Sequence, residues 1–207
     1  MAMTPLTLEQ LKSIADTHSI TYEYLPSESE TAVATKMSRV FNIPQERMFD
    51  LFANLENHPT FFPHLKAVKV ITNEDLGNVL QDNQVLMAEG LEEGGSKLGV
   101  KLFTLLKPHR IEGQLLTDPF ATINTRDPKR GTINWDFERV DDNSSKMTVE
   151  SNFVPDSNKF FSRGMVDHVW MDFFENTMVH LDELSQEDRF TNLLGNKTER
   201  FRTTFGE

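Results

Sequence analysis

The sequence predicts an α+β fold, in which an antiparallel sheet is followed by one long C-terminal helix. After residue 65 the hydrophobic residues recur with a period of two, in six short segments separated by turns rich in Gly, Pro and Asp. After Pro155 a helical period takes over and continues through Phe160–Leu184. The chain has 207 residues, 38% hydrophobic and 26% charged, which is typical of a globular domain with its own core.

The N-terminal segment Thr7–His18 predicts a short amphipathic helix. Thr7 is suited to the N-cap, and Gln10 follows three residues later, as in a capping box. The apolar stripe of this helix comprises Leu8, Leu11 and Ile14. Because Pro26–Glu30 has the composition of a linker, we expect residues 1–30 to form an appendage before the main domain.

The main domain is expected to begin with one strand and two short helices. Ala32–Asn42 is rich in apolar and β-branched residues and predicts a strand. Pro44–Leu55 carries apolar residues at helical spacing, and its proline suits the first turn of a helix. Glu56–Leu65 contains two prolines, so it is at most a short helix between turns.

The six predicted strands that follow are Lys66–Thr72, Asn83–Leu91, Gly99–Lys107, Arg110–Leu116, Thr132–Val140 and Lys146–Val154. The apolar stripe of the C-terminal helix comprises Val166, Trp170, Phe173, Phe174, Met178, Leu181 and Leu184. The chain becomes polar near residue 187. We therefore expect a main domain over residues 31–187 and a loose polar tail over residues 188–207.

The composition also limits the classes of function. The formal net charge of −11 opposes binding to phosphate backbones and to anionic bilayers, so we expect no nucleic-acid partner. The absence of Cys removes disulfides, thiolate catalysis and Cys-based zinc sites. Met1–Leu11 does not resemble a signal peptide, and no segment has the length and apolar character of a membrane span. We expect a cytoplasmic protein without a cofactor or metal.

The order of these elements resembles that of the START-like (SRPBCC, helix-grip) superfamily, which includes polyketide cyclases, birch-pollen allergen-like proteins and coenzyme Q-binding proteins. The local motifs that carry the resemblance are Phe49–Pro59, Phe62–Val68, Lys107–Gly113 and Gly131–Glu138. It covers about Ala32–Gln186. The resemblance implies a curved seven-stranded antiparallel sheet wrapped around the C-terminal helix, with two short helices after the first strand and an apolar cavity.

The resemblance implies that the cavity is lined by aromatic, Met and Val side chains. For any single aromatic residue, packing in a core is the commoner role. Together, Phe and Met side chains suit a flexible apolar ligand such as a lipid, an isoprenoid or an aromatic metabolite. The expected lining residues are Phe61, Phe62, Val85, Met87, Phe103, Trp135, Phe137, Met147, Trp170 and Phe174.

Four polar residues are weak candidates for catalysis. Glu89 shares a strand face with Val85 and Met87, and on a concave face it would need a partner such as Lys101 or Arg110. The competing interpretation is a strand-end residue that reaches solvent. His64 lies near the expected cavity mouth and is a candidate general base, but His58 and His64 are more commonly surface loop residues. No zinc motif such as HExxH is present.

Three functions remain open, because the motifs are structural and one scaffold hosts many activities. The first is binding of a hydrophobic small molecule for carriage or sensing. The second is a polyketide cyclase or dehydrase activity in the same cavity, so whether the chain is an enzyme stays open. The third is a chaperone-activator-like protein that binds a partner through the helix, since Gly164–Asp188 has seven acidic residues and no Lys or Arg.

Overall fold

The computed structural model describes residues 7–26, 33–61, 65–71, 84–90, 97–116, 131–153, 171 and 175–181. Within these residues, eight strands form one antiparallel sheet in the order β1-β2-β8-β7-β6-β5-β4-β3. The strands are β1 Thr21–Leu25, β2 Val33–Phe41, β3 Leu65–Val70, β4 Val85–Gly90, β5 Lys97–Leu106, β6 Arg110–Leu116, β7 Thr132–Arg139 and β8 Ser145–Phe153. The helices are α1 Leu8–Thr17, α2 Gln45–Ala53, the 3₁₀ helix η1 Leu55–Asn57 and α3 His58–Phe61.

The predicted α+β class is confirmed. Each predicted strand begins and ends within two residues of the ends of an observed strand. Residues 175–181 and Met171 are helical, whereas the rest of Phe160–Leu184 lies outside the described residues. The full length of the C-terminal helix therefore stays a prediction. The division into residues 1–30, 31–187 and 188–207 stays a prediction as well.

Among the described residues, the sheet has eight strands, one more than the seven that were predicted. This strand is β1, which pairs with β2 over five residue pairs, from Thr21↔Ser38 to Leu25↔Ala34. Its side chains are exposed or half-buried without a buried position, so the sequence has no strong period of two there. Pairing along β2, which is decided by the tertiary structure, makes this short segment a strand.

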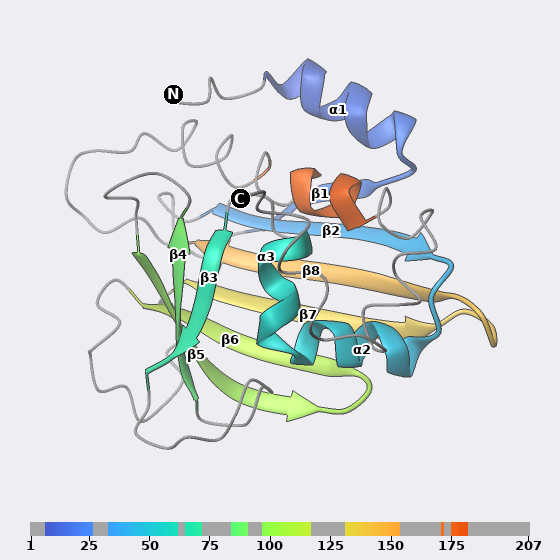
Figure 1. Ribbon diagram of the computed structural model, residues 1–207. Coiled ribbons are helices and arrows are strands. Elements are labelled where there is room, and N and C mark those ends of the chain that lie inside the picture. The colour runs from blue at the N-terminus through green and yellow to red at the C-terminus, as the bar shows by residue number, and fades with distance from the viewer. Residues whose placement is uncertain are drawn as a thin grey trace, which may run out of the picture.

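The two faces of the sheet differ, and the register identifies them. Met37, Val149, Trp135, Ile111 and Leu105 lie opposite one another across β2, β8, β7, β6 and β5. These side chains belong to the hydrophobic core or pack against it. We call this face the inner face and the opposite one the outer face. The helices α2 and α3 and residues 175–181 lie on the inner side of the sheet (Figure 1).

The sheet is strongly bent, so that β3 and β4 run across the direction of β7 and β8 (Figure 1). Two register shifts accompany this bend, one in β3 between Leu65 and Ala67 and one in β5 between Leu102 and Thr104. An extra residue in one strand of a pair bends that strand and increases its twist. The bend turns the inner face of β3–β5 toward the helices.

The helix α1 begins at the predicted capping box. The backbone N–H of Thr7 donates to Oε1 of Gln10 at 2.8 Å, and the backbone N–H of Gln10 donates to the Thr7 hydroxyl at 3.3 Å. Leu11 and Ala15 are fully buried, which confirms the burial expected of Leu11. A left-handed Ser19 (φ 56°) then reverses the chain into β1. The N-terminal segment thus packs onto the main sheet.

Candidate ligand-binding site

The α2 end of the inner face is filled by aromatic packing. The Phe137 ring on β7 lies 5.7 Å from the Phe49 ring and 5.4 Å from the Phe52 ring, both on α2. None of the three side chains is more than 2% exposed, and Met147 on β8 is fully buried. Phe137 and Met147, two of the predicted lining residues, are therefore inner-face core residues at the α2 end.

A polar link holds α2 at this position. The Nε2 atom of Gln45, at the start of α2, donates to the carbonyl oxygen of Phe137 at 2.5 Å and lies 3.0 Å from Nδ1 of His109. Lys107, in the turn between β5 and β6, pairs with Asp50 of α2 at 2.6 Å. These contacts tie α2 both to β7 and to the β5–β6 turn.

The rest of the inner face is covered less completely. Several hydrophobic side chains there pack against the core while they remain partly exposed. The register places Val70 opposite Leu86 and Leu86 opposite Val100, which continues the inner face across β3, β4 and β5. The inner apolar surface comprises Val68, Val70, Val100, Leu105 and Trp135. Its partial exposure makes it the best candidate for contact with an apolar ligand.

Gly113 on β6 shapes the floor of this surface. It pairs with Leu102 on one side and Ile133 on the other, so a side chain at this position would point to the inner face. A Cβ atom there would lie 2.8 Å from Cγ1 of Val100. Because Gly113 has no side chain, the Val100 side chain approaches the backbone of β6 closely. A close approach of this kind is a common reason for a glycine inside a strand.

The structure corrects the placement of Val85 and Met87, which the sequence analysis assigned to the cavity lining. Val85 lies opposite Lys101, and Met87 lies opposite Gly99 and Lys69. Their neighbour Leu86 belongs to the core cluster on the inner face. Because successive side chains of a strand point to opposite faces, Val85 and Met87 lie on the outer face.

Of the six remaining predicted lining residues, the structure describes the side chains of two, Trp135 and Phe103. Trp135 lies on the inner face, whereas the Phe103 ring lies 5.4 Å from Nζ of Lys101, an outer-face residue. The side chain of Phe61 and all of Phe62, Trp170 and Phe174 lie outside the described residues. Their predicted contact with a ligand stays a prediction.

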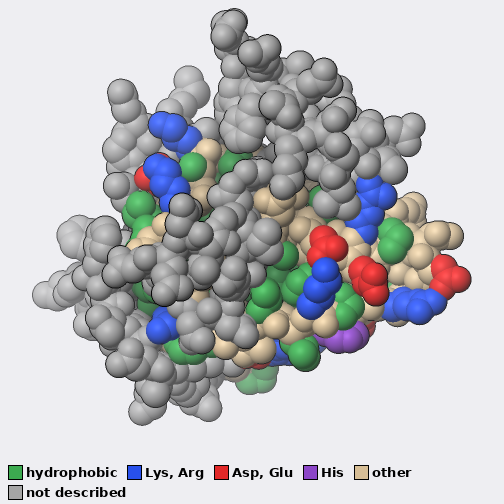
Figure 2. Space-filling model, turned by 60° about the horizontal axis from the view of Figure 1, so that its bottom comes forward, with side chains coloured by type: hydrophobic (Ala, Val, Ile, Leu, Met, Phe, Trp, Pro, Cys, Tyr) green, Lys and Arg blue, Asp and Glu red, His purple; other side chains and the backbone are tan. Residues whose placement is uncertain are grey.

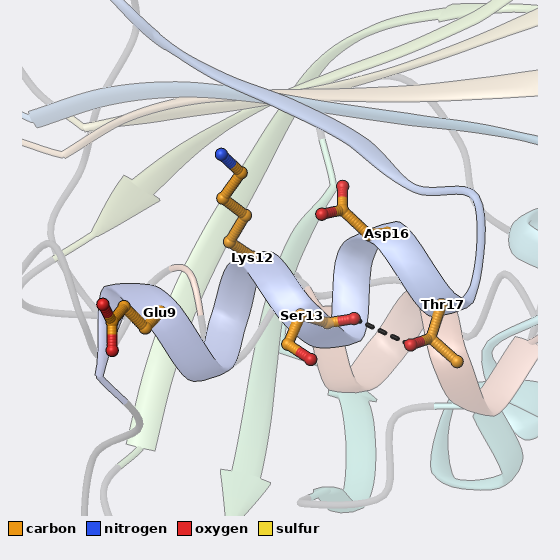
Figure 3. Close-up of a pocket in the computed structure, with 5 residues that line it drawn as sticks. All are labelled: Glu9, Lys12, Ser13, Asp16 and Thr17. Carbon is orange, nitrogen blue, oxygen red and sulfur yellow. Dashed lines mark hydrogen bonds between the residues drawn. The ribbon is translucent and has the colours of Figure 1, made fainter.

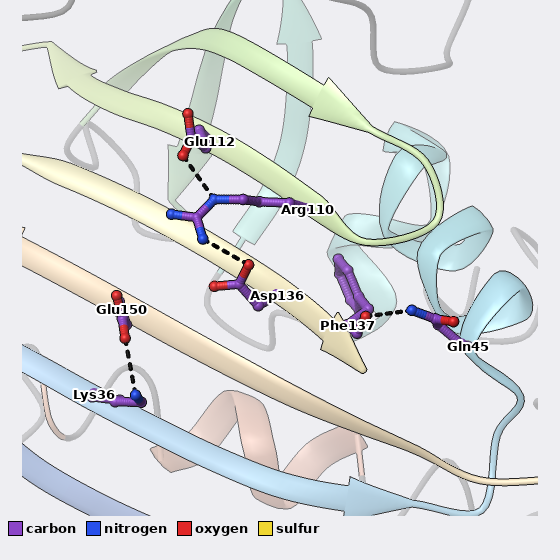
Figure 4. A network of polar contacts seen from close by, with 7 residues as sticks. All are labelled: Lys36, Gln45, Arg110, Glu112, Asp136, Phe137 and Glu150. Carbon is purple, nitrogen blue, oxygen red and sulfur yellow. Dashed lines mark hydrogen bonds and ion pairs between the residues drawn. The ribbon is translucent and has the colours of Figure 1, made fainter. Parts of the chain in front are cut away.

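The register places three of the four catalytic candidates on the outer face. Glu89 lies on the outer face and pairs with Lys69 at 3.2 Å, not with Lys101 or Arg110. Arg110 pairs on the outer face with Glu112 at 2.7 Å and with Asp136 at 2.9 Å (Figure 4). Lys101 lies opposite Val85, also on the outer face. His64 lies outside the described residues.

The outer face carries a ladder of ion pairs. Lys36 on β2 pairs with Glu150 on β8 at 3.1 Å, beside the Arg110 group (Figure 4). Burial raises the pKa of Asp136, and the Arg110 guanidinium only partly offsets this. In the view of Figure 2, acidic and basic side chains are mixed on the described surface. Pairs of this type contribute little to stability and are typical of a solvated sheet face.

His58 is half-buried in α3 and packs against Phe52, whereas a surface loop position had been expected. It begins α3, and its Nε2 atom donates to the carbonyl oxygen of Phe52 at 2.7 Å. Its ring lies 6.5 Å from the Phe52 ring. Burial lowers the pKa of His58 to about 4, and the hydrogen bond to Phe52 offsets only part of this shift. His58 is therefore neutral at neutral pH and serves a structural role.

Glu175 is a polar inner-face residue that the sequence analysis missed, because it was counted with the acidic outer face of the C-terminal helix. Its exposed fraction is 1%, and Met171 and Met178, four residues before and three residues after it, are fully buried. This spacing places Glu175 in the buried stripe of the helix. The same spacing was visible in the sequence and would have identified it.

The described part of the chain also bears on metal, membrane and polar-pocket sites. Among those residues, no group of three or more His, Asp or Glu side chains could hold a metal ion. None of the described helices is long and apolar enough to cross a membrane. A shallow pocket on α1 is lined by Glu9, Lys12, Ser13, Asp16 and Thr17 (Figure 3). Its polar lining does not suit a hydrophobic ligand.

Solved structures with low sequence identity share this fold. XoxI from Bacillus cereus has a TM-score of 0.56 at 13% identity, covering 75% of this chain and 97% of XoxI. Ara h 8.0201 has a TM-score of 0.53 at 10% identity, covering 75% of this chain and 98% of that protein. Protein Ms6760 from Mycobacterium smegmatis has a TM-score of 0.50 at 12% identity, covering 81% and 98% of the two chains.

A search of curated proteins finds no match. The sequence model of one family, described as polyketide cyclase / dehydrase and lipid transport, matches residues 41–169, which is more than half of the chain. This match and the shared fold confirm the resemblance to the START-like superfamily. The chain belongs to the polyketide cyclase / dehydrase and lipid transport family.

Proposed function

We propose that this protein binds a hydrophobic small molecule on the inner apolar surface and acts as its carrier or sensor. The observation that carries this proposal is the partial exposure of Val68, Val70, Val100, Leu105 and Trp135 on the helix-covered face of the sheet. The family description, which includes lipid transport, supports the same class of ligand.

Physical chemistry favours an apolar occupant. Removing apolar surface from water stabilises a complex by about 25 cal/mol per Å² of buried area. The five side chains of the surface are hydrophobic, and the charged residues of the neighbouring strands, such as Lys69 and Glu89, lie on the outer face. A lipid, an isoprenoid or an aromatic metabolite would bury this surface without leaving a charge unpaired.

The family description also includes cyclases and dehydrases. Such chemistry needs an acid or base positioned against the substrate. Glu89, Lys101 and Arg110 lie on the outer face, away from the inner apolar surface. We therefore favour binding over catalysis.

A matched pair of variants tests the proposal. Val68→Asp places a carboxylate on the inner apolar surface, and Val40→Asp places one at an outer-face position where Val40 is 49% exposed. We expect Val68→Asp to weaken binding of the neutral dye Nile red at least about tenfold, because a buried unpaired charge costs several kcal/mol. Val40→Asp should bind as the wild type does.

The measurement is a fluorescence titration of both folded variants, together with organic extraction of the purified wild-type protein and mass spectrometry of the extract. A lipid or isoprenoid in the extract would define the ligand class. Equal dye affinities of the two variants would place the ligand elsewhere and contradict the proposal.

A further inference from the structure

We propose that Gln45, His109 and Phe137 form a proton-sensitive latch that holds the start of α2 against the sheet. The latch is closed while His109 is neutral. When His109 takes up a proton in mild acid, the start of α2 loosens and the inner face retains an apolar ligand less tightly. The effect on the ligand rests on the proposed function, whereas the release of α2 does not.

The latch joins three separate parts of the chain. Gln45 is the first residue of α2, His109 lies in the turn between β5 and β6, and Phe137 lies on β7. The Gln45 side chain reaches from α2 to the carbonyl oxygen of Phe137 (Figure 4). Its Nε2 atom lies 2.5 Å from that oxygen and 3.0 Å from Nδ1 of His109. One amide nitrogen therefore contacts both β7 and the β5–β6 turn.

The chemistry of these atoms determines where the protons lie. A backbone carbonyl oxygen only accepts hydrogen bonds, so the amide nitrogen of Gln45, and not its oxygen, must face Phe137. That nitrogen has two hydrogens and donates both. Nδ1 of His109 must therefore accept the second hydrogen, which requires that Nδ1 carries no proton. The closed latch thus contains a neutral His109 with its proton on Nε2.

Protonation of His109 breaks this arrangement. An imidazolium ring donates from both nitrogens, so the new Nδ1–H would point at the N–H of Gln45. The backbone of His109 is held in place, because its N–H donates to the Leu106 carbonyl oxygen at 2.6 Å and its carbonyl oxygen accepts from the Phe137 N–H at 2.8 Å. Rotation of the Gln45 amide would give His109 an acceptor but would turn an oxygen toward the Phe137 carbonyl oxygen. Either response removes a hydrogen bond that attaches α2.

The surroundings of His109 suit a response to pH. His109 is exposed, so protons reach it from solvent, and histidine ordinarily changes its charge between about pH 5 and 8. Lys107 of the same turn pairs with Asp50 at 2.6 Å, which ties the middle of α2 to the turn and confines the opening to the start of the helix. The other charged groups on the elements around the latch are Glu46 and Arg47 of α2, and the outer-face residues Arg110, Asp136 and Glu138.

The latch lies beside the inner apolar surface. Phe137 packs against Phe49 and Phe52 of α2, and Trp135 lies two positions before Phe137 on the same face of β7. Release of the start of α2 would let water reach this aromatic contact next to Trp135. Because retention of an apolar ligand depends on the exclusion of water, ligand affinity should decrease together with the attachment of α2.

The experiment compares the full-length wild type with His109→Asn. The asparagine oxygen is able to accept from Gln45 but does not titrate. Hydrogen exchange at the Met48 amide reports the latch, because this N–H donates to the Pro44 carbonyl oxygen at 2.9 Å in the first turn of α2. From about pH 7.5 to about pH 5.5, protection of Met48 should decrease about threefold to tenfold more in the wild type than in His109→Asn, as expected for the loss of one hydrogen bond.

The comparison at equal pH removes the intrinsic pH dependence of exchange and the contribution of His58, which both proteins share. Gln45→Glu should reverse the response, since the new carboxylate is repelled by the Phe137 carbonyl oxygen and accepts from protonated His109. His18→Asn, at the end of α1, is the control and should respond as the wild type does. Equal pH dependence of Met48 exchange in the wild type and His109→Asn would overturn the latch.

Titration with Nile red, which is neutral, tests the effect on the ligand at the same two pH values. Dye affinity should decrease in acid for the wild type, in step with Met48 protection, and should decrease less for His109→Asn. A dye affinity that ignores pH while Met48 responds would overturn the control of ligand retention. Absence of dye binding at either pH would contradict the proposed function, and the exchange at Met48 would still decide whether the latch exists.

Discussion

His58 illustrates how the setting of one side chain decides its chemistry. It donates to the Phe52 carbonyl oxygen from a half-buried position, and loss of hydration there lowers its pKa to about 4. Glu89, in contrast, reaches Lys69 on the outer face and has no role on the inner face. Residue type alone does not separate these two cases, because the distinction depends on which neighbours exclude water.

Acidification is expected to destabilise the protein through His58. Its pKa is about 4 in the folded state and 6.5 as an unperturbed histidine, so between these values the unfolded state binds more protons. The free energy of unfolding should therefore decrease as the pH falls from 6.5 to 4, by about 3 kcal/mol in total. His58→Gln keeps an N–H donor for Phe52 but cannot titrate, so its stability should lack this component.

The comparison requires urea unfolding of the wild type and His58→Gln at several pH values. Other titrating groups contribute equally to both proteins, and the difference between the two curves isolates His58. Parallel curves across this range would show that His58 is already accessible to protons in the folded protein.

Gly113→Ala is expected to destabilise the sheet at the floor of the inner apolar surface. The new Cβ atom would lie 2.8 Å from Cγ1 of Val100, closer than side chains normally approach. Overpacking of this kind costs about 1–3 kcal/mol. Val100→Ala removes the opposing methyl group, so in a double-mutant cycle Gly113→Ala should cost much less in the Val100→Ala background. Additive effects in urea unfolding would mean that Val100 is not the limiting contact.

At the scale of elements, the N-terminal α1–β1 unit extends the sheet and contributes to its core. The strand β1 pairs with β2 along its whole length, and Ala15 and Ile20 belong to the same core cluster as Met178 and Leu181. The bulges in β3 and β5 act at the opposite side of the sheet, where they bend the inner face toward the helices. The local chain geometry at both sides thus determines the shape of the candidate site.

Leu11→Ala tests whether α1 is an integral part of the fold. Leu11 is fully buried, and removing a buried leucine side chain typically costs about 2–5 kcal/mol. Lys12→Ala, at the adjacent exposed position of the same helix, should change the stability by less than about 0.5 kcal/mol. Thermal and urea unfolding of both variants would distinguish the two positions. Equal stabilities would indicate that α1 detaches from the sheet at little cost.

At the scale of the whole molecule, the topology joins distant parts of the chain. The strand β2 lies between β1 and β8, and it pairs with β8 from Val33↔Phe153 to Phe41↔Ser145. The sheet is therefore complete only after most of the chain has been brought together, as is common in folds with non-local strand pairing. The same arrangement brings the charge of Glu175 near enough to Tyr22 that, after burial, it contributes to the raised pKa of the Tyr22 phenol.

The sequence by itself determined seven of the eight described strands and the family. Periodicity predicted the strands, the capping box predicted the start of α1, and local motifs indicated the superfamily. These signals are local, since they depend on residues close together in the chain. Local signals also predicted that Val85, Met87 and Glu89 share one strand face, and the register agrees with this.

Only the tertiary structure decided which face became the inner one. The helices cover the face with Leu86, so Val85, Met87 and Glu89 lie outside, and a shift of one residue reverses such an assignment. The strand β1 forms because β2 offers an edge, and Glu175 is buried because its helix packs on the sheet. These outcomes depend on contacts between residues far apart in the sequence, and the pattern of any one segment does not contain them.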